Sequence, residues 1–201
     1  MSEATAATSV DPILSHRHRH MLEAKSAIMP EVIRARGYRT IEDPEELLKL
    51  GYETYQARTP GLLVPLYDIW GNLSSYQHRP DDPRENAEGK LVKYETRAGH
   101  RQVLDANPIL GERLRDPSDP LIVTEGARKA DAAISEGYVA VALSGVWCWR
   151  KNGVPLPEWE DIKLYGRVVY VALDSDAQTN PHVLKASIGL CEFLRSRGAN
   201  A

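Results

Sequence analysis

Three short apolar runs in the second half of the chain place the tightest limits on its fold. They are LIVTEG at residues 121–126, VAVALSG at 139–145 and RVVYVAL at 167–173, and helical patterns follow the first and the third. Strands that are apolar at nearly every position are buried on both faces, and strands that alternate with helices usually pair in parallel. The sequence therefore predicts an α/β fold, with its ligand site at the carboxyl ends of the strands.

Two helices accompany these strands. Residues 127–137, ARKADAAISEG, place small and apolar side chains at helical spacing before a closing glycine. A later helix is expected to begin with Asn180 as its cap and Pro181 at its first position, and to stop at Gly198. The long stretch 146–166 between the second and third strands is interpreted as an insertion.

The first half of the chain has a different pattern. Residues 1–11 are small and polar, which predicts a disordered tail. Residues 12–50 have a helical pattern in two pieces, 13–38 and 43–52. Two apolar runs within residues 60–80 surround a Gly-Asn pair and predict a β-hairpin. The run LVKYET at residues 91–96 is a further strand candidate.

A proline- and aspartate-rich stretch, residues 105–120, is the expected boundary between two parts of the chain. It divides the sequence into a helical plus small α+β subdomain at residues 12–118 and an α/β domain at residues 119–201.

Composition excludes several classes of protein. A formal net charge of −3 argues against a general polyanion binder, so binding to nucleic acid would need a local basic patch. Only Cys148 and Cys191 are present, which excludes a zinc ribbon and argues against a disulfide framework. No apolar stretch reaches the length of about 18 residues that a membrane span needs, and the first residues do not resemble a signal peptide. We therefore expect a cytoplasmic protein with no membrane partner.

Three carboxylates lie where predicted strands end. Glu125 follows the first strand, and Asp174 and Asp176 follow the third. Residues two apart in an extended segment point to the same side, so the three side chains would gather at one edge of the sheet if these strands are neighbours. Two unit charges about 4 Å apart repel by about 4 kcal/mol at an effective dielectric near 20. A divalent cation with oxygen ligands, Mg²⁺ or Mn²⁺, would remove that repulsion.

An Asp-x-Asp pair alone is weak support for a metal, because Asp176 could instead organise the turn before the last helix. The Glu125–Gly126 pair at the end of another strand favours the metal hypothesis. Gly126 would also let a phosphate approach the backbone where the helix begins.

The segments LIVTEGARKADAAISEGYVAVALSG and VVYVALDSDA resemble the Toprim domain, the metal-binding fold of bacterial-type primases, type I and II topoisomerases and some nucleases. Glu125, Gly126, Asp174 and Asp176 match its glutamate-glycine pair and its Asp-x-Asp motif. The chain is most similar to the Toprim-like half of primase-helicase proteins from phages, plasmids and other mobile elements, a family with a domain of formally unknown function.

The resemblance extends upstream, to the small subdomain that precedes Toprim in bacterial primases. Gly71, Arg79, Lys93 and Tyr94 match its hairpin and its basic segment. The resemblance implies that Arg79 and Lys93 contact template or triphosphate phosphates and that Tyr94 packs or stacks. Arg128 and Lys129, at the start of the helix after Glu125, are further candidates for contact with substrate phosphates.

The family implies a Toprim-like parallel sheet with flanking helices, preceded by a small α+β subdomain. It also implies Mg²⁺-dependent (or Mn²⁺-dependent) nucleotidyl transfer, with nucleotides and single-stranded DNA as substrates and a helicase as partner. Glu125, Asp174 and Asp176 would hold the metal and carry catalysis, with Glu125 alternatively a general base. The sequence departs from cellular primases in lacking their zinc module, and it ends where the next strand of a Toprim sheet is expected.

Other polar and aromatic residues have competing interpretations. His16 and His20 could share a helix face, but no third ligand stands out, so a solvated, partly basic helix surface is favoured over a metal site. Phosphate contact is a hypothesis for nearby Arg34, Arg36 and Arg39. Base stacking competes with anchoring of the insertion to the core for Trp147, Trp149 and Trp159.

Two other functions stay open. A Toprim nuclease would use the same acids to degrade a strand. A replication-associated DNA-binding module would have no activity of its own.

Overall fold

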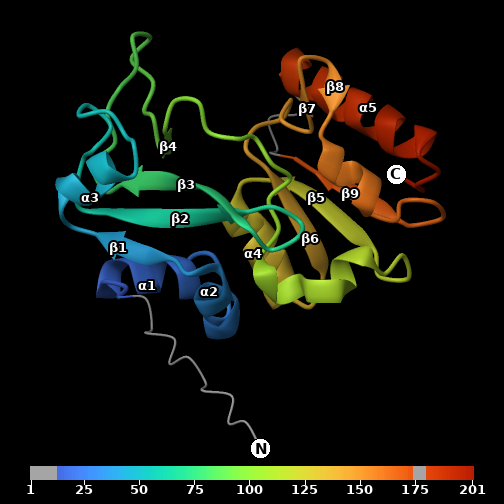
Figure 1. Cartoon of the computed structure of the whole chain (residues 1–201), viewed down its shortest axis with the longest axis horizontal. Helices are drawn as coiled ribbons and strands as arrows, with labels where there is room; N and C mark the ends of the chain where they lie inside the picture. The colour runs from blue at the N-terminus through green and yellow to red at the C-terminus, as the bar shows by residue number, and fades with distance from the viewer. Residues whose placement is uncertain (1–12, 174–179) are drawn as a thin grey trace, which may run out of the picture.

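The computed structural model describes residues 13–173 and 180–201. Its amino-terminal half contains an antiparallel sheet in the order β1-β2-β3-β4, with α1 and α2 below it in Figure 1. The elements of this half are α1 (His16–Glu23), α2 (Pro30–Arg36), β1 (Arg39–Ile41), α3 (Pro44–Lys49), β2 (Gly61–Tyr67), β3 (Leu73–Pro80) and β4 (Glu95–Thr96).

The predicted hairpin is confirmed as β2 and β3, and its turn shows why it forms. The Asp68 carboxylate accepts hydrogen bonds from the backbone N–H groups of Trp70 and Asn72, and Gly71 takes a φ of +83°. This is a conformation that glycine adopts readily. The chain can therefore reverse within a few residues while Asp68 stays buried.

Two predictions for this half are wrong in detail. The helical pattern of residues 13–38 is divided into α1 and α2, and Gly37 ends α2 with a φ of +76° before β1 pairs with β2. The strand expected at residues 91–96 is reduced to Glu95 and Thr96.

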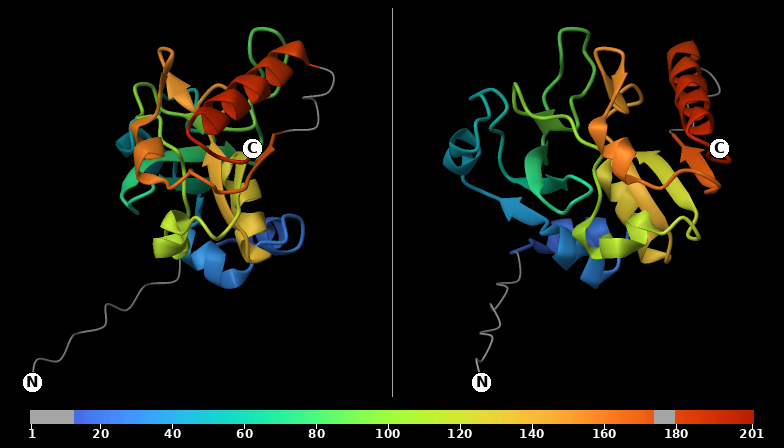
Figure 2. Two further views of the ribbon diagram at one scale, coloured as in Figure 1. Left: turned by 90° about the vertical axis from the view of Figure 1, so that its right-hand side faces the viewer. Right: turned by 45° about the vertical axis from the view of Figure 1, so that its right-hand side comes forward.

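The carboxy-terminal half contains the predicted parallel sheet. Its strands are β5 (Leu121–Glu125), β6 (Val139–Leu143) and β9 (Val169–Ala172), in the order β6-β5-β9. Helix α4 (Ala127–Ser135) connects the first two strands, and α5 (Pro181–Ser196) packs against β9 (Figure 2). The Asn180 side chain accepts a hydrogen bond from the His182 N–H at 3.0 Å, as its predicted role as helix cap requires.

The insertion between β6 and β9 forms a small hairpin, β7 (Arg150–Lys151) and β8 (Val154–Pro155), followed by the 3₁₀ helix η2 (Pro157–Asp161). The Trp149 and Trp159 rings lie 5.2 and 5.7 Å from the Phe193 ring of α5, and both side chains are buried. Anchoring to the core is therefore confirmed for these two tryptophans.

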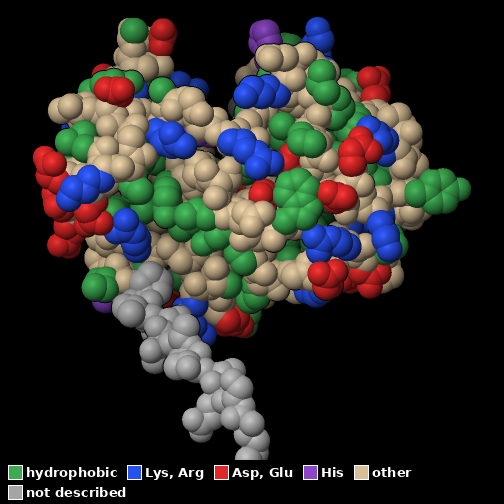
Figure 3. Space-filling model, in the orientation of Figure 1, with side chains coloured by type: hydrophobic (Ala, Val, Ile, Leu, Met, Phe, Trp, Pro, Cys, Tyr) green, Lys and Arg blue, Asp and Glu red, His purple; other side chains and the backbone are tan. Residues whose placement is uncertain are grey.

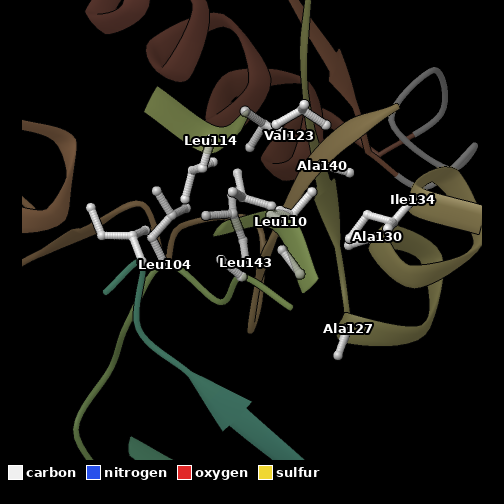
Figure 4. Close-up of a cluster of buried hydrophobic side chains, with 14 of the residues drawn as sticks. Leu104, Leu110, Leu114, Val123, Ala127, Ala130, Ile134, Ala140 and Leu143 are labelled. Atoms are coloured by element: carbon white, nitrogen blue, oxygen red, sulfur yellow. The ribbon is translucent and has the colours of Figure 1, made fainter. Parts of the chain in front are cut away.

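One apolar cluster spans both halves of the chain (Figure 4). The expected boundary, residues 105–120, lies partly inside it through Leu110 and Leu114 of η1 (Pro108–Arg115). Backbone hydrogen bonds of 2.9 and 2.8 Å also join Asp105 to Ala142 of β6. The division at residues 118 and 119 stays a prediction. Within the described ranges, no helix has the length and apolar character needed to cross a membrane.

Candidate functional site

A pocket of about 540 Å³ lies at the carboxyl ends of β5 and β6, where the two halves of the chain meet. Several residues singled out from the sequence line it: Lys93, Tyr94, Glu125, Gly126, Arg128 and Lys129. They come from the segment before β4, the end of β5 and the first turn of α4. The pocket thus brings basic and acidic candidates from both halves into one cavity. Figure 3 shows a hollow at the top of that view, with Lys and Arg side chains on both sides of it.

Glu125 is the last residue of β5, and Gly126 is the N-cap of α4. Gly126 has a φ of +83°, and its N–H donates to the Leu143 carbonyl oxygen at 2.9 Å. A residue with a side chain would be strained in this conformation. Gly126 is therefore required for the sharp turn that places the Glu125 carboxylate beside the helix start.

The pKa of Cys148, at the start of the insertion, is influenced by Glu125. Burial first and the Glu125 carboxylate second raise the pKa of the Cys148 thiol. The Cys148 thiol therefore lies within electrostatic range of the Glu125 carboxylate. This proximity could not be predicted, because a lone cysteine in an insertion has no local pattern.

Arg128 is held by the pocket wall. Its Nη1 donates to the Tyr94 hydroxyl at 3.2 Å, and its Nη2 donates to Ser26 Oγ at 2.5 Å. The Arg79 guanidinium lies 5.9 Å from the centre of the Tyr94 ring, within the range of a cation–π interaction. Tyr94 thus connects two of the predicted cations, while the exposed Lys93 and Lys129 lie at the pocket edge.

Asp174 and Asp176 lie outside the described residues. Among the described residues of this edge, Thr124 pairs with Ala172, and Thr124 Oγ1 donates to the Ala172 carbonyl oxygen at 2.8 Å. The end of β9 therefore lies beside the residue that precedes Glu125. Across residues 13–173 and 180–201, no three His, Cys, Asp or Glu side chains form a group that could hold a metal.

The donor set nevertheless suits a hard divalent cation. Glu125 supplies carboxylate oxygens at the edge where β9 leaves the sheet, and carboxylates are the ligands that Mg²⁺ prefers. Metal ligation by Glu125, Asp174 and Asp176 stays a prediction.

Several residues of the pocket were not among the predicted site residues, and two of them, Lys25 and Ser26, lie far from the others in the sequence. Lys25 and Ser26 belong to the loop between α1 and α2 and line the pocket opposite the start of α4. Ser26 is separated from its partner Arg128 by 102 positions in the chain, so no local spacing could reveal the contact.

The hypothesis of phosphate contact is wrong for Arg36, which is fully buried. His18, which was not singled out from the sequence, is also buried, with its ring between Thr40 Oγ1 at 2.7 Å and Asp81 Oδ1 at 2.9 Å. His16 and His20 are exposed as expected.

Comparison with known proteins supports the fold. A family described as a domain of unknown function (DUF3854) matches residues 113–201, and a comparison with curated protein sequences found no match. The crystal structure of the zinc-binding and RNA polymerase domains of the Aquifex aeolicus primase superposes with a TM-score of 0.59 at 17% identity, covering 92% of this chain and 48% of that one. A DNA primase domain from Pseudomonas aeruginosa gives a TM-score of 0.54 at 14% identity, covering 87% of this chain and 60% of that one.

At these identities the likeness establishes the fold. The predicted fold class, a Toprim-like parallel sheet with flanking helices preceded by a small α+β subdomain, is confirmed. The chain spans about half the length of the first of these primase structures.

Proposed function

We propose that this chain is a primase-like nucleotidyltransferase module that synthesises primers on single-stranded DNA with the help of Mg²⁺. The observation that carries the proposal is the pocket at the carboxyl ends of β5 and β6. It collects Glu125 and the cations Lys93, Arg128 and Lys129 on the fold of a primase catalytic domain. A metal-dependent phosphoryl chemistry needs this combination of an acidic edge and nearby positive charge.

The acidic edge would hold the metal through Glu125, Asp174 and Asp176. When bound there, Mg²⁺ would neutralise charge on phosphate oxygens and favour ionisation of the primer 3′-hydroxyl. Gly126 leaves the backbone at the start of α4 accessible to a phosphate, since no side chain covers its N-cap position.

The cations would bind and orient the substrate. Arg128 offers a planar guanidinium already oriented by Tyr94 and Ser26, and Lys93 and Lys129 add exposed ammonium groups at the pocket edge. Arg79 would act from behind Tyr94, where its charge stabilises the ring position. The proposed setting is a replication protein of a phage, plasmid or other mobile element, in which a helicase supplies the single-stranded template.

Primer synthesis tests the proposal directly. The chain would be incubated with single-stranded DNA, the four ribonucleotides or deoxynucleotides and Mg²⁺, and labelled products would be separated by length. Glu125→Gln and Asp174→Asn are each expected to lower synthesis at least a hundredfold, because each removes a carboxylate from the metal site. Glu136→Gln, an exposed carboxylate just past the end of α4, is the matched control.

The outcomes separate the rival functions. Full synthesis by both acidic-site variants would overturn the metal assignment. Shortening of the DNA strand instead of primer growth would favour a nuclease. Binding of single-stranded DNA with neither synthesis nor cleavage would favour a non-catalytic binding module.

A further inference from the structure

The loop that joins α1 to α2 forms one wall of the pocket. Lys25 and Ser26 face the first turn of α4 across the cavity, although they lie about a hundred positions away in the chain. The buried Leu22 at the end of α1 and the buried Ile28 within the loop fix this segment to the core. The same loop also contacts a residue of the candidate site, because Ser26 accepts a hydrogen bond from Arg128.

The hydrogen bonds of Ser26 have a defined direction. Its Oγ donates its only proton to the Met21 carbonyl oxygen at 2.9 Å, so the oxygen lone pairs are left to accept from Arg128 Nη2 at 2.5 Å. The serine hydroxyl thus acts as a relay from the end of α1 to the guanidinium. A side chain without a hydroxyl could not replace it.

Arg128 is fixed from a second direction by Tyr94, whose hydroxyl accepts from Nη1 at 3.2 Å. The two contacts leave the guanidinium little freedom to rotate. A cation ordered before its ligand arrives loses less conformational entropy on binding, so its interaction with an anion is stronger. Arg128 is therefore poised to meet an oxyanion in one orientation.

The backbone beside Ser26 is held in an unusual conformation. Ala27 has a φ of +53°, in the left-handed region that residues with a side chain seldom adopt. Strained backbone of this kind persists where the surroundings hold it in place, and it is frequent at ligand-binding sites. At Ala27 it sets the direction in which the loop presents Ser26.

We propose that Ser26 is a positioning residue that holds the Arg128 guanidinium for the polyphosphate of a bound nucleoside triphosphate. This rests on the proposed function, because it assigns the ligand class of the same pocket. The anion is identified by its chemistry: the pocket also presents Lys25, Lys93 and Lys129, and several cations in one cavity suit a ligand with several phosphate charges.

Equilibrium binding of a non-hydrolysable nucleoside triphosphate, followed by calorimetry in the presence of Mg²⁺, tests the inference. Ser26→Ala is expected to weaken binding about tenfold, because a hydrogen bond to a charged group is lost. Ser26→Thr keeps the hydroxyl and is expected to restore most of the affinity. The matched control is Ser196→Ala, which removes a similar hydrogen bond, Oγ to the Phe193 carbonyl oxygen, in α5.

A double-mutant cycle separates positioning from general damage. Arg128→Gln removes the group that Ser26 orients, so Ser26→Ala should cause no further loss of affinity in that background. Melting temperatures are measured for every variant, and the loss of nucleotide affinity in Ser26→Ala is expected to persist at temperatures where all variants are fully folded. In primer synthesis, Ser26→Ala should raise the KM for the nucleotide and leave kcat nearly unchanged.

Two failures are distinguishable. Normal nucleotide affinity in Ser26→Ala, or independent losses from Ser26→Ala and Arg128→Gln, would overturn this inference and leave the proposed function standing. Absence of nucleotide binding by the unaltered chain would overturn both.

Discussion

Arg36 of α2 binds Asp131 of α4 through two parallel hydrogen bonds, Nε to Oδ2 at 2.6 Å and Nη2 to Oδ1 at 2.8 Å. The same guanidinium donates to Asp105 Oδ1 at 2.9 Å, and the Tyr38 hydroxyl donates to Asp131 Oδ2 at 2.7 Å. All four side chains are buried. The first turn of α4 carries Arg128, so this network sets where the pocket cation lies relative to the amino-terminal half.

Asp131→Ala is expected to lower the free energy of unfolding by about 3–5 kcal/mol, because it leaves the buried Arg36 charge with only part of its compensation. Urea denaturation near neutral pH measures the loss. The control is Glu160→Ala, which breaks a pair with Arg197 in which both side chains are exposed and should cost less than about 1 kcal/mol. Equal losses in the free energy of unfolding of the two variants would mean that the buried Arg36–Asp131 pair does not hold α2 to α4.

His78 predicts a dependence of stability on pH. Its side chain is fully buried in β3, and burial lowers its pKa to about 4. An unfolded histidine has a pKa of about 6.5, so between these values the unfolded chain binds a proton that the folded chain does not. The part of the free energy of unfolding that depends on neutral His78 is therefore fully present above a pH of about 6.5. It is lost as the pH falls to about 4, and the free energy of unfolding decreases by roughly 3 kcal/mol over this range.

The comparison that isolates this effect uses His78→Gln, which cannot titrate. The free energy of unfolding of the unaltered chain, measured by denaturant titration at several pH values, should fall more steeply across that window than that of His78→Gln. His16→Gln, at an exposed position of α1, should keep the steep slope. Parallel curves for the unaltered chain and His78→Gln would contradict the prediction.

The parts of the fold that the sequence predicted are those with local signals. β5, β6 and β9 are nearly continuous apolar runs. The Asn180–Pro181 pair marks the start of α5, with Asn180 as the cap and Pro181 as the first helical residue. β1 was missed because its three residues gain their structure from pairing with β2, as Thr40 does with Leu62. Pairing between distant segments leaves no periodicity in a short run.

The candidate site also contains features with a local sequence signal and features that depend on distant residues. The positions of Glu125 and Gly126 at the end of β5 were predictable because the end of a buried strand is a local feature with a known place in the fold. Their roles stay a prediction. The burial of Arg36 was not predictable, since it depends on Asp131, which lies 95 positions later. Charged side chains are exposed by default, and only the partner brought by the fold reverses that expectation.

Gly61 and Gly189 predict opposite effects of the same substitution. A methyl group at Gly61 in β2 would overlap the His78 ring and would lie 2.9 Å from the Arg79 carbonyl oxygen. Gly61→Ala is therefore expected to destabilise the chain by about 1–3 kcal/mol through overpacking. At Gly189 in α5 the added carbon would meet only the Trp149 ring, at an ordinary 3.7 Å.

Gly189→Ala is expected to raise the free energy of unfolding by about 0.5–1 kcal/mol, because alanine loses less backbone freedom than glycine in a helix. Thermal and urea unfolding of the two variants would show the opposite signs. A loss of stability in Gly189→Ala as large as that in Gly61→Ala would show that α5 packs more tightly on the insertion than the distances indicate.

Trp159 anchors the insertion that contains Cys148. It is 2% exposed, its ring meets Phe193 edge to face at 5.7 Å, and its Nε1 donates to the Trp149 carbonyl oxygen at 3.0 Å. Trp159→Ala is expected to cost about 3–5 kcal/mol, because it opens a large cavity and breaks this hydrogen bond. Trp159→Phe, which keeps most of the ring volume, should cost about half as much or less.

Trp70 offers the matched control, since it also donates a ring hydrogen bond, to Asp161 at 3.1 Å, but is 41% exposed. Trp70→Ala should therefore cost less than about 1 kcal/mol by urea denaturation. Release of the insertion in Trp159→Ala should also expose Cys148, whose alkylation by a thiol reagent would become faster than in Trp70→Ala. If the two variants unfold at the same urea concentration and Cys148 reacts equally slowly in both, then the insertion is held by contacts other than the tryptophan cluster.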